Sequence, residues 1–337
     1  MRKDVMEQVS IKEKNYKVIS FKEIKAKPIN WLFQDFLAYG KITMVQGDPG
    51  SGKTSLALKL ASEFSNGITP YGEKLKKPIK TLLLLSEDDW EDTIRPKLNK
   101  MGARVGNVLS FKLDRENDFT PLTDERIEEI IKDEKIGLLI VDPIQAFLPD
   151  NVDMNKMSDV RPVMSHLINM ANRNHCAVLI LQHLNKNVQV KNVYRGSGSL
   201  DFNASARIVL TIMKPLKEVS KSISRNLRYA QITKSNIGHD NQCLFFRLDD
   251  DKVIDWVMKE ELSEHELMLF QPNTAISKKE EVMNYLKKKL AEGELPAGDL
   301  IKQITQELGV SIDTVNIVKR SIGVKSTKRG ANWYWYI

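Results

Sequence analysis

The sequence predicts an α/β fold with a mostly parallel central sheet, because strand-like apolar runs alternate with helix-like stretches along much of the chain. The runs Leu82–Leu85 and Leu138–Val141 are continuously apolar, as expected of central strands buried on both faces. The segment Gly47–Thr54 matches the phosphate-binding pattern G-x-x-x-x-G-K-[ST]. It lies between a short apolar run and a helix-like stretch, which is the context this pattern requires.

The elements can be placed in order along the chain. The apolar pattern predicts strands over 41–46, 81–86, 108–112, 137–141 and 177–182, with helices over 124–132 and 157–173. Further strand-like runs at 208–213, 228–233 and 244–248 follow without helix-length gaps. Such closely spaced strands indicate an antiparallel extension of the same sheet.

Composition shifts divide the chain into four parts. Residues 1–27 are rich in Lys and Glu and are expected to form an arm or edge strand, with an alternating piece at 16–21. The main α/β domain is expected over 28–260, and residues 261–276 lose periodicity like a linker. Residues 277–337 then predict a small domain with helices over 281–290, 297–308 and 311–322 and an aromatic strand over 330–337.

The overall composition is that of a globular protein, with 42% hydrophobic and 28% charged residues. The net charge of +7 allows a polyanionic partner without requiring one. The two cysteines, Cys176 and Cys243, form neither a metal-binding spacing nor a disulfide framework, which fits a reducing, cytoplasmic environment. No apolar run is long enough to span a membrane, and the first residues lack the apolar core of a signal peptide.

The Gly-rich segment predicts a nucleoside triphosphate site. Its glycines allow successive backbone N–H groups to turn toward a phosphate at the positive end of a helix dipole. Lys53 adds a positive charge over the β- and γ-phosphates, and the Thr54 hydroxyl is a ligand for Mg²⁺. The residues expected to hold the nucleotide here are Gly47, Asp48, Pro49, Gly50, Ser51, Gly52, Lys53, Thr54 and Ser55.

Two carboxylates follow predicted strands. Asp142 ends the run Leu138–Val141, where a carboxylate is expected to join Thr54 in holding Mg²⁺. Glu87 follows the strand after the phosphate-binding loop, where it could orient the attacking water as a general base. The alternative for this acidic segment is a helix N-cap, which Asp88 or Asp89 would supply.

Polar and basic residues gather after the strand at 177–182. His183 ends that strand, where it either senses the γ-phosphate or has no role. The loop beyond it suits contact with nucleic-acid phosphates, and Arg207 or Lys234 could reach a neighbouring subunit's nucleotide. The alternative for each basic side chain is a solvated surface charge. The loop residues expected to bind DNA are Lys186, Lys191, Arg195, Gly196 and Ser197.

The order of these motifs resembles that of the RecA/DnaB superfamily over about residues 28–258. The segments that carry the resemblance are Gly47–Thr54, Ser86–Asp88, Val141–Pro143, Gln182–His183, Arg195–Ser197 and Ala206–Arg207. Within that superfamily the chain is most similar to the RepA-type hexameric replicative helicases of plasmids, and to related ATPases of phages and mobile elements.

The resemblance implies a role for each matching position. Glu87 would be the catalytic base, Asp142 the Mg²⁺ carboxylate, and His183 the link between the γ-phosphate and the DNA loop. Arg207 would act in trans as an arginine finger. Lys234 resembles the lysine of a late-strand Lys-x-Arg/Asn element, another contact in trans, and the third position here is Asn236, not Arg. The missing arginine leaves the division of the finger role between Arg207 and Lys234 open.

The C-terminal part resembles a winged helix. Leu308–Ser311 would be the turn between two helices, and 311–319 would be a recognition-type helix. Lys325, Lys328 and Arg329 then lead into a Trp- and Tyr-rich wing strand. Two interpretations stay open: this domain contacts DNA, or it docks a protein while Trp333 and Trp335 lie in its own core.

These observations predict an ATP- and Mg²⁺-dependent DNA motor, expected to be a hexameric homo-oligomer that grips single-stranded DNA in a central channel. A primase or an initiator protein is a candidate partner. The alternatives are a RecA-like ATPase that loads or remodels proteins on DNA without unwinding it, and a DNA-binding regulator that uses nucleotide as a switch.

Overall fold

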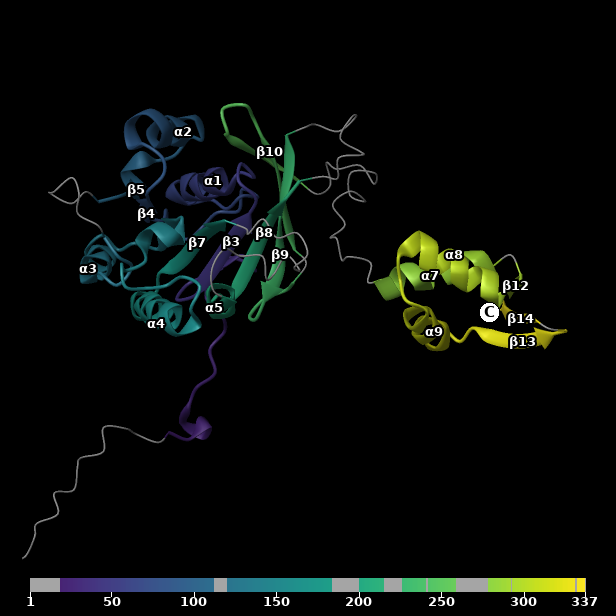
Figure 1. Cartoon of the computed structure of the whole chain (residues 1–337). Helices are drawn as coiled ribbons and strands as arrows, with labels where there is room; N and C mark the ends of the chain where they lie inside the picture. The colour runs from purple at the N-terminus through teal and green to yellow at the C-terminus, as the bar shows by residue number, and fades with distance from the viewer. Residues whose placement is uncertain are drawn as a thin grey trace, which may run out of the picture.

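The computed structural model describes residues 19–111, 120–183, 200–214, 226–240, 242–258, 278–291, 293–330 and 332–336. Its largest sheet has nine strands, in the order β11-β10-β9-β8-β3-β7-β6-β4-β5 (Figure 1). The six strands from β8 to β5 pair in parallel, and β9, β10 and β11 continue the sheet antiparallel. The expected α/β fold with a mostly parallel sheet is therefore confirmed, together with its antiparallel extension.

The strands fall close to their predicted positions. The parallel part consists of β3 (Ile42–Gly47), β4 (Thr81–Leu85), β5 (Val108–Leu109), β6 (Leu138–Asp142), β7 (Ala177–His183) and β8 (Ile208–Met213). The extension consists of β9 (Leu227–Ser235), β10 (Cys243–Leu248) and β11 (Ile254–Val257). Strand β5 is shorter than predicted because it pairs with β4 at only two positions.

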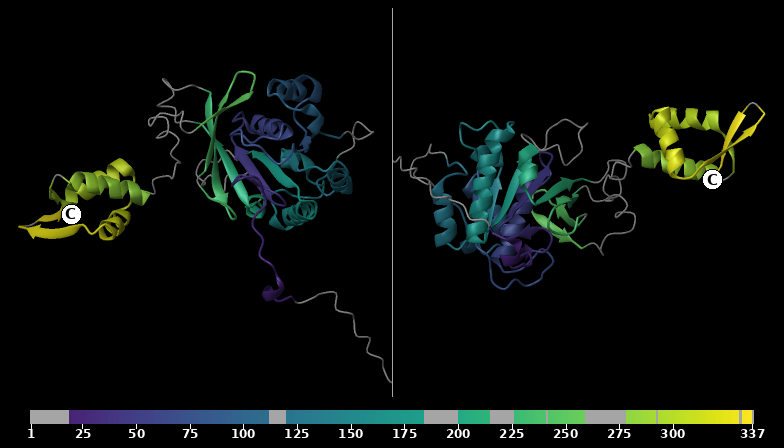
Figure 2. Two further views of the ribbon diagram at one scale, coloured as in Figure 1. Left: turned by 180° about the vertical axis from the view of Figure 1, so that it is seen from behind. Right: turned by 90° about the horizontal axis from the view of Figure 1, so that it is seen from below.

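Helices cover both faces of this sheet (Figures 1 and 2). On one face, α1 (Lys53–Ser65) and α2 (Arg95–Lys100) pack against side chains such as Val45 and Leu83. On the other face, α3 (Glu125–Asp133), α4 (Met157–Asn174) and α5 (Leu200–Ser205) enclose a second core around Met44 and Ile180. Because the central strands are buried on both faces, their sequences are continuously apolar.

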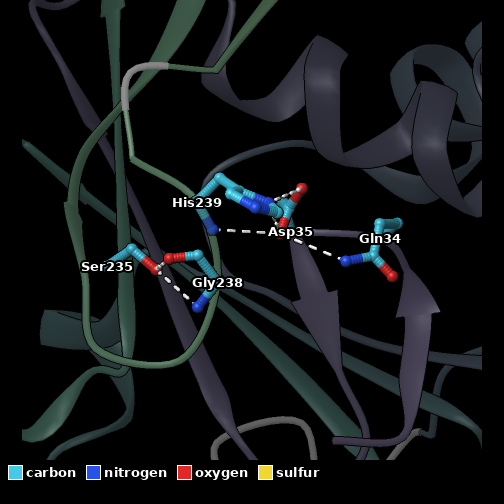
Figure 3. A network of polar contacts seen from close by, with 5 residues as sticks. All are labelled: Gln34, Asp35, Ser235, Gly238 and His239. Carbon is cyan, nitrogen blue, oxygen red and sulfur yellow. Dashed lines mark hydrogen bonds and ion pairs between the residues drawn. The ribbon is translucent and has the colours of Figure 1, made fainter.

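A short hairpin of β1 (Trp31–Phe33) and β2 (Leu37–Ala38) precedes the sheet and is fastened to the β9–β10 turn. The Asp35 carboxylate accepts hydrogen bonds from the His239 backbone N–H at 3.1 Å and from the Gln34 amide at 3.2 Å (Figure 3). A Cβ on Gly238 would lie only 2.6 Å from Asp35 Oδ1 and 2.9 Å from the Trp31 ring, so a larger residue here would displace these side chains. The contact joins segments about 200 residues apart.

The arm predicted over 1–27 is described only from residue 19. Its described part contains the short helix η1 (Phe21–Glu23) and no strand, while residues 16–18 of the alternating piece lie outside the described residues.

The C-terminal part has a core of its own. It contains α7 (Lys278–Leu290), α8 (Ala297–Leu308) and α9 (Ile312–Ser321). A three-stranded antiparallel sheet in the order β12-β14-β13 accompanies them, built from β12 (Leu295–Pro296), β13 (Lys325–Arg329) and β14 (Asn332–Tyr336). Trp335 of β14 is buried with Leu300, Ile304 and Val315 in this core. In the described part of the chain, no helix is long and apolar enough to cross a membrane.

We expect the contact between α3 and α4 to weaken in acid. The hydrogen bonds from Arg173 and Asn174 hold the Glu128 carboxylate ionised and lower its pKa from 4.5 to about 2. A depressed pKa means that this stabilisation is complete above pH ~4.5 and is lost as the pH falls toward ~2. Glu128→Gln should therefore lower the melting temperature at pH 7, and its difference from the unchanged protein should shrink between pH ~4.5 and ~2.

The control is Glu129→Gln, a change at the exposed neighbouring position. Thermal unfolding followed by circular dichroism at several pH values measures both variants. A difference between Glu128→Gln and the unchanged protein that is the same at pH 7 and pH 2.5 would contradict the expectation.

Candidate nucleotide-binding site

The phosphate-binding loop connects the central strand β3 to α1. Gly50 and Gly52 have backbone φ angles of 68° and 98°, a left-handed region that glycine occupies without steric cost. The last of these glycines is the N-cap of α1, so the first N–H groups of the helix face the loop. No heavy atom lies within 4 Å of a Cβ built on Gly50, so the loop is open at this point.

Lys53 is buried at the start of α1, and its ammonium group is held by the loop itself. Its Nζ donates hydrogen bonds to the carbonyls of Gly47 at 3.0 Å and Asp48 at 3.2 Å. Burial lowers the pKa of Lys53, and the negative charges of Asp142 and Glu87 oppose that shift. These carboxylates therefore help to keep the buried lysine positively charged.

Thr54 and Asp142 meet beside Lys53. The Thr54 hydroxyl donates a hydrogen bond to Asp142 Oδ2, which joins the first turn of α1 to the end of β6. Burial raises the pKa of Asp142, whereas this hydrogen bond opposes the increase. A hydroxyl and a carboxylate placed together in this way fit Mg²⁺, which binds oxygen ligands and brings its own positive charge.

Glu87 lies at the same edge of the sheet and is exposed to solvent. The backbone N–H of Ser86 donates to the Asp142 carbonyl at 3.2 Å and so holds the end of β4 beside the end of β6. Asp89 is the N-cap of η2 (Trp90–Ile94) and accepts hydrogen bonds from the N–H groups of Glu91 and Asp92. The capping alternative therefore applies to Asp89 and leaves the Glu87 carboxylate available for chemistry.

His183, at the end of β7, reaches the same carboxylate. Its Nε2 lies 3.5 Å from Glu87 Oε1, so the two predicted site residues are neighbours. Their strands, β4 and β7, are separated by β6 in the sheet. The contact therefore crosses the strand that carries Asp142.

The residues present fit a Mg²⁺-bound nucleoside triphosphate. Positive-φ glycines, a buried ammonium and a hydroxyl–carboxylate pair surround one loop at a helix N-terminus. The Ser51 hydroxyl oxygen is buried and has no hydrogen-bond partner among the described residues. A phosphate oxygen in the loop would give this hydroxyl an acceptor.

Sequence reasoning missed a buried polar bridge directly before the phosphate-binding loop. The Gln46 amide donates to the Thr211 hydroxyl of β8 at 3.0 Å, and its carbonyl oxygen accepts from Asn203 of α5 at 3.3 Å. The only sequence signal was a polar residue, Gln46, directly before the Gly-rich loop. Because Gln46 adjoins Gly47, this bridge fixes the strand end that enters the loop.

The two predicted trans-acting cations differ in their surroundings. Lys234 of β9 donates to the carbonyls of Asn203 at 2.6 Å, Ala206 at 2.9 Å and Ala204 at 3.2 Å. It thus caps the C-terminal end of α5 within its own chain. Arg207 is exposed at the start of β8, so its side chain faces solvent.

The five residues predicted to bind DNA lie outside the described residues. They all fall within 184–199, between the end of β7 and the start of α5.

A sequence model of the AAA domain family (AAA_25) matches residues 10–189. The curated relatives include the DNA repair protein RadA of Streptococcus pyogenes serotype M6, which is 22% identical over 206 residues, covering 54% of this chain and 40% of the relative. The DNA repair protein RadA of Chlamydia muridarum is 21% identical over 230 residues, covering 67% of this chain and 43% of the relative. The chain spans about two fifths of the length of these relatives.

Two solved structures are similar to this one. A DnaB-like replicative helicase, described with its interactions with primase, has a TM-score of 0.50 and 14% identity, covering 64% of this chain and 57% of its own. The RadB recombinase has a TM-score of 0.46 and 16% identity, covering 66% of this chain and 93% of its own. The likeness to the DnaB-like helicase agrees with a RecA-like P-loop ATPase fold.

We expect Lys234→Met to destabilise the fold, because three carbonyls at the end of α5 would lose a charged hydrogen-bond donor. A lost hydrogen bond to a charged group costs about 1.5–3 kcal/mol, so the free energy of unfolding should fall by about that amount. Urea denaturation measures it, with Lys214→Met at an exposed strand end as the control. If Lys234→Met kept its stability but lost ATP turnover, Lys234 would instead contact the nucleotide of a neighbouring subunit, as the resemblance implies.

Proposed function

Since the chain belongs to the AAA domain family, we propose that it is an ATP-dependent DNA motor of the RecA/DnaB type. More specifically, we propose that it is a hexameric replicative DNA helicase of a plasmid, phage or mobile element. It would hydrolyse ATP at subunit interfaces and grip single-stranded DNA. The chain covers only part of its relatives, so the activity of the whole protein is part of this proposal.

One observation carries the proposal of ATP hydrolysis. The ends of four parallel strands, β3, β7, β6 and β4, bring Lys53, His183, Asp142 and Glu87 to one edge of the sheet. Ligands of open α/β sheets bind outside the carboxyl ends of such strands. A site that only bound nucleotide would need the phosphate-binding loop, but not an exposed carboxylate beside it.

Each side chain has a task in the proposed hydrolysis. Lys53, held by the Gly47 and Asp48 carbonyls, would neutralise charge on the β- and γ-phosphates. Glu87 would accept a hydrogen bond from the attacking water and orient it toward the γ-phosphate. His183, 3.5 Å from Glu87, would respond to the presence of the γ-phosphate through that carboxylate.

Thr54 and Asp142 would hold Mg²⁺, which when bound supplies positive charge to the phosphate oxygens. Because burial raises the pKa of Asp142, an added cation would favour the ionised carboxylate. The hydrogen bond from the Thr54 hydroxyl already orients that carboxylate toward the loop.

The proposal of an oligomer rests on Arg207. Its side chain is exposed at the start of β8, where a neighbouring subunit could receive it. An arginine finger supplied in trans contributes 10³–10⁵-fold in rate, so isolated subunits should turn over slowly. Lys234 would support the finger from within its chain by capping α5. Lys186, Lys191, Arg195, Gly196 and Ser197 remain the proposed DNA contacts.

Two other functions remain as alternatives. A loader or remodeller would hydrolyse ATP on DNA without separating its strands. This alternative agrees with the name of the RadA relatives, which are DNA repair proteins. A nucleotide-switched regulator would bind ATP with negligible turnover.

For the proposed motor, the partner would be a primase or an initiator protein. The proposed location is the cytoplasm.

The first expected outcome is DNA-stimulated ATP turnover that depends on Glu87. We expect Glu87→Gln to lower the turnover rate about 10²–10⁴-fold while ATP still binds, because the change removes the base but not the phosphate contacts. Steady-state hydrolysis with and without single-stranded DNA, at several protein concentrations, measures the rate. Lys53→Ala is the variant expected to lose nucleotide binding, and Glu91→Gln at an exposed position is the matched control.

The outcomes separate the three functions. Turnover that rises with DNA and protein concentration, together with strand displacement, supports the helicase. Turnover without strand displacement supports the loader or remodeller. Nucleotide binding without turnover under every condition would support the switch and exclude the motor.

Mixing two inactive variants tests whether the finger acts in trans. Lys53→Ala lacks the phosphate contact and Arg207→Ala lacks the finger, so each should be inactive alone. In a mixed assembly, the intact Arg207 of one subunit can face the intact Lys53 of another and restore part of the turnover. Titrating one variant into the other measures this recovery, and its absence at every ratio would contradict an interface site built with Arg207.

A further inference from the structure

The β13–β14 hairpin of the C-terminal part places one tryptophan inside the core and a second one outside it. Trp335 is 4% exposed and pairs with Ser326 on the facing strand. The Lys319 ammonium of α9 lies 4.7 Å from the Trp335 ring centroid and donates a hydrogen bond to the Ser326 hydroxyl. These contacts anchor the hairpin to α9 and fix its direction.

Trp333 lies two residues earlier on β14 and therefore faces the same side of the hairpin as Trp335. Its side chain is 54% exposed, because the hairpin extends here beyond the core that covers Trp335. The residue directly opposite is Lys328 of β13, which is also exposed. A large aromatic surface and an ammonium group thus lie side by side and face solvent.

The same hairpin carries a second pair of this kind. Lys325 lies opposite Tyr336, which is 36% exposed, on the other side of the two-stranded ribbon. On that side, Arg329 lies 5.9 Å from the ring of Tyr334 and forms an ion pair with Glu294. Glu294 thus offsets the charge of Arg329, while Lys325 and Lys328 remain exposed.

The sequence around the hairpin is strongly basic. Residues 319–337 contain no Asp or Glu, and their five cations are Lys319, Arg320, Lys325, Lys328 and Arg329. Asp313 stands in the first turn of α9, whereas Lys319 and Arg320 stand in its last turn, next to the hairpin. Positive charge is therefore concentrated along the last turn of α9 and the hairpin that follows it, and Trp333 belongs to that hairpin.

We propose that the β13–β14 hairpin binds single-stranded nucleic acid, with the Trp333 ring stacking on a base and the neighbouring Lys328 contacting a phosphate. Stacking needs a base whose face is free, which a single strand offers and an intact duplex does not. Interleaved aromatic and basic side chains are the composition of such platforms. Aromatic side chains are enriched at protein interfaces too, but lysine is depleted there, so the exposed Lys328 beside Trp333 favours a polyanion over a protein.

This inference does not rest on ATP hydrolysis. The hairpin shares no residue with the nucleotide site, so Trp333→Ala should leave ATP turnover measured without DNA unchanged. A chain that failed every ATPase test could still bind single-stranded DNA through the hairpin, and the two proposals can therefore fail separately.

The experiment uses the full chain without nucleotide and a 5′-fluorescein-labelled oligothymidylate of about 20 nucleotides. We expect Trp333→Ala to weaken binding by at least about fivefold, the lower end of what base–aromatic stacking contributes, and Trp333→Phe to retain most of the affinity. Ile317→Ala is the matched control, because Ile317 is 51% exposed on α9 in the same part of the chain. Fluorescence anisotropy gives the affinities.

The contribution of Lys328 is read from the salt dependence. Each phosphate contact to a single strand adds about 0.7 to the slope of log K against log salt, so Lys328→Ala should reduce that slope by about this amount. Lys302→Ala, at an exposed position on α8, should leave the slope unchanged.

A site-specific readout completes the test. Oligonucleotides that contain 5-iododeoxyuridine are photocrosslinked to the unchanged protein, and the adduct is located by mass spectrometry. An adduct on Trp333 supports the proposal. Equal affinities of Trp333→Ala and the unchanged protein, or adducts only outside 325–336, would overturn it.

Discussion

The parallel pairing of β3, β7, β6 and β4 is the constraint on which the rest of the structure depends. Parallel strands end at one edge of a sheet, so the register of these four strands brings the loop after β3 next to Asp142, Glu87 and His183. Helices on both faces bury the strands and make this register hard to change. The hydrogen bond from Ser86 N–H to the Asp142 carbonyl then extends the alignment one residue beyond β4.

At this edge, buried charges depend on one another. Lys53 lies in a site where burial alone would favour its neutral form, and Asp142 lies where burial would favour a protonated carboxyl group. Their opposite charges offset part of both effects, as expected for buried ionisable groups that are close together. A nucleotide with Mg²⁺ would bring further charges of both signs. Buried charges such as Lys53 and Asp142 are costly on their own, but they can pair with the opposite charges of such a ligand.

Polar groups behind the site give it rigidity. Gln46 joins the strand end before the loop to Thr211 and Asn203, and Lys234 holds the carbonyls at the end of α5. Buried networks of this kind stabilise one arrangement when their members are satisfied. In the C-terminal part, Trp335 and Lys319 play a comparable role, since they fix the hairpin that leaves Trp333 in solvent.

The sequence by itself determined most strands of the large sheet, the helices α1, α3, α4 and α7 to α9, the phosphate-binding loop and the candidate carboxylates, because periodicity, glycine spacing and strand-end acids are local signals. Only the tertiary structure decided that Asp89 caps a helix while Glu87 stays exposed, and that Lys234 is engaged within its own chain. It also decided which of Trp333 and Trp335 enters the core, and that Asp35 meets the β9–β10 turn. The physical reason is that capping, charge pairing and burial depend on contacts between residues far apart in the chain, which no local pattern specifies.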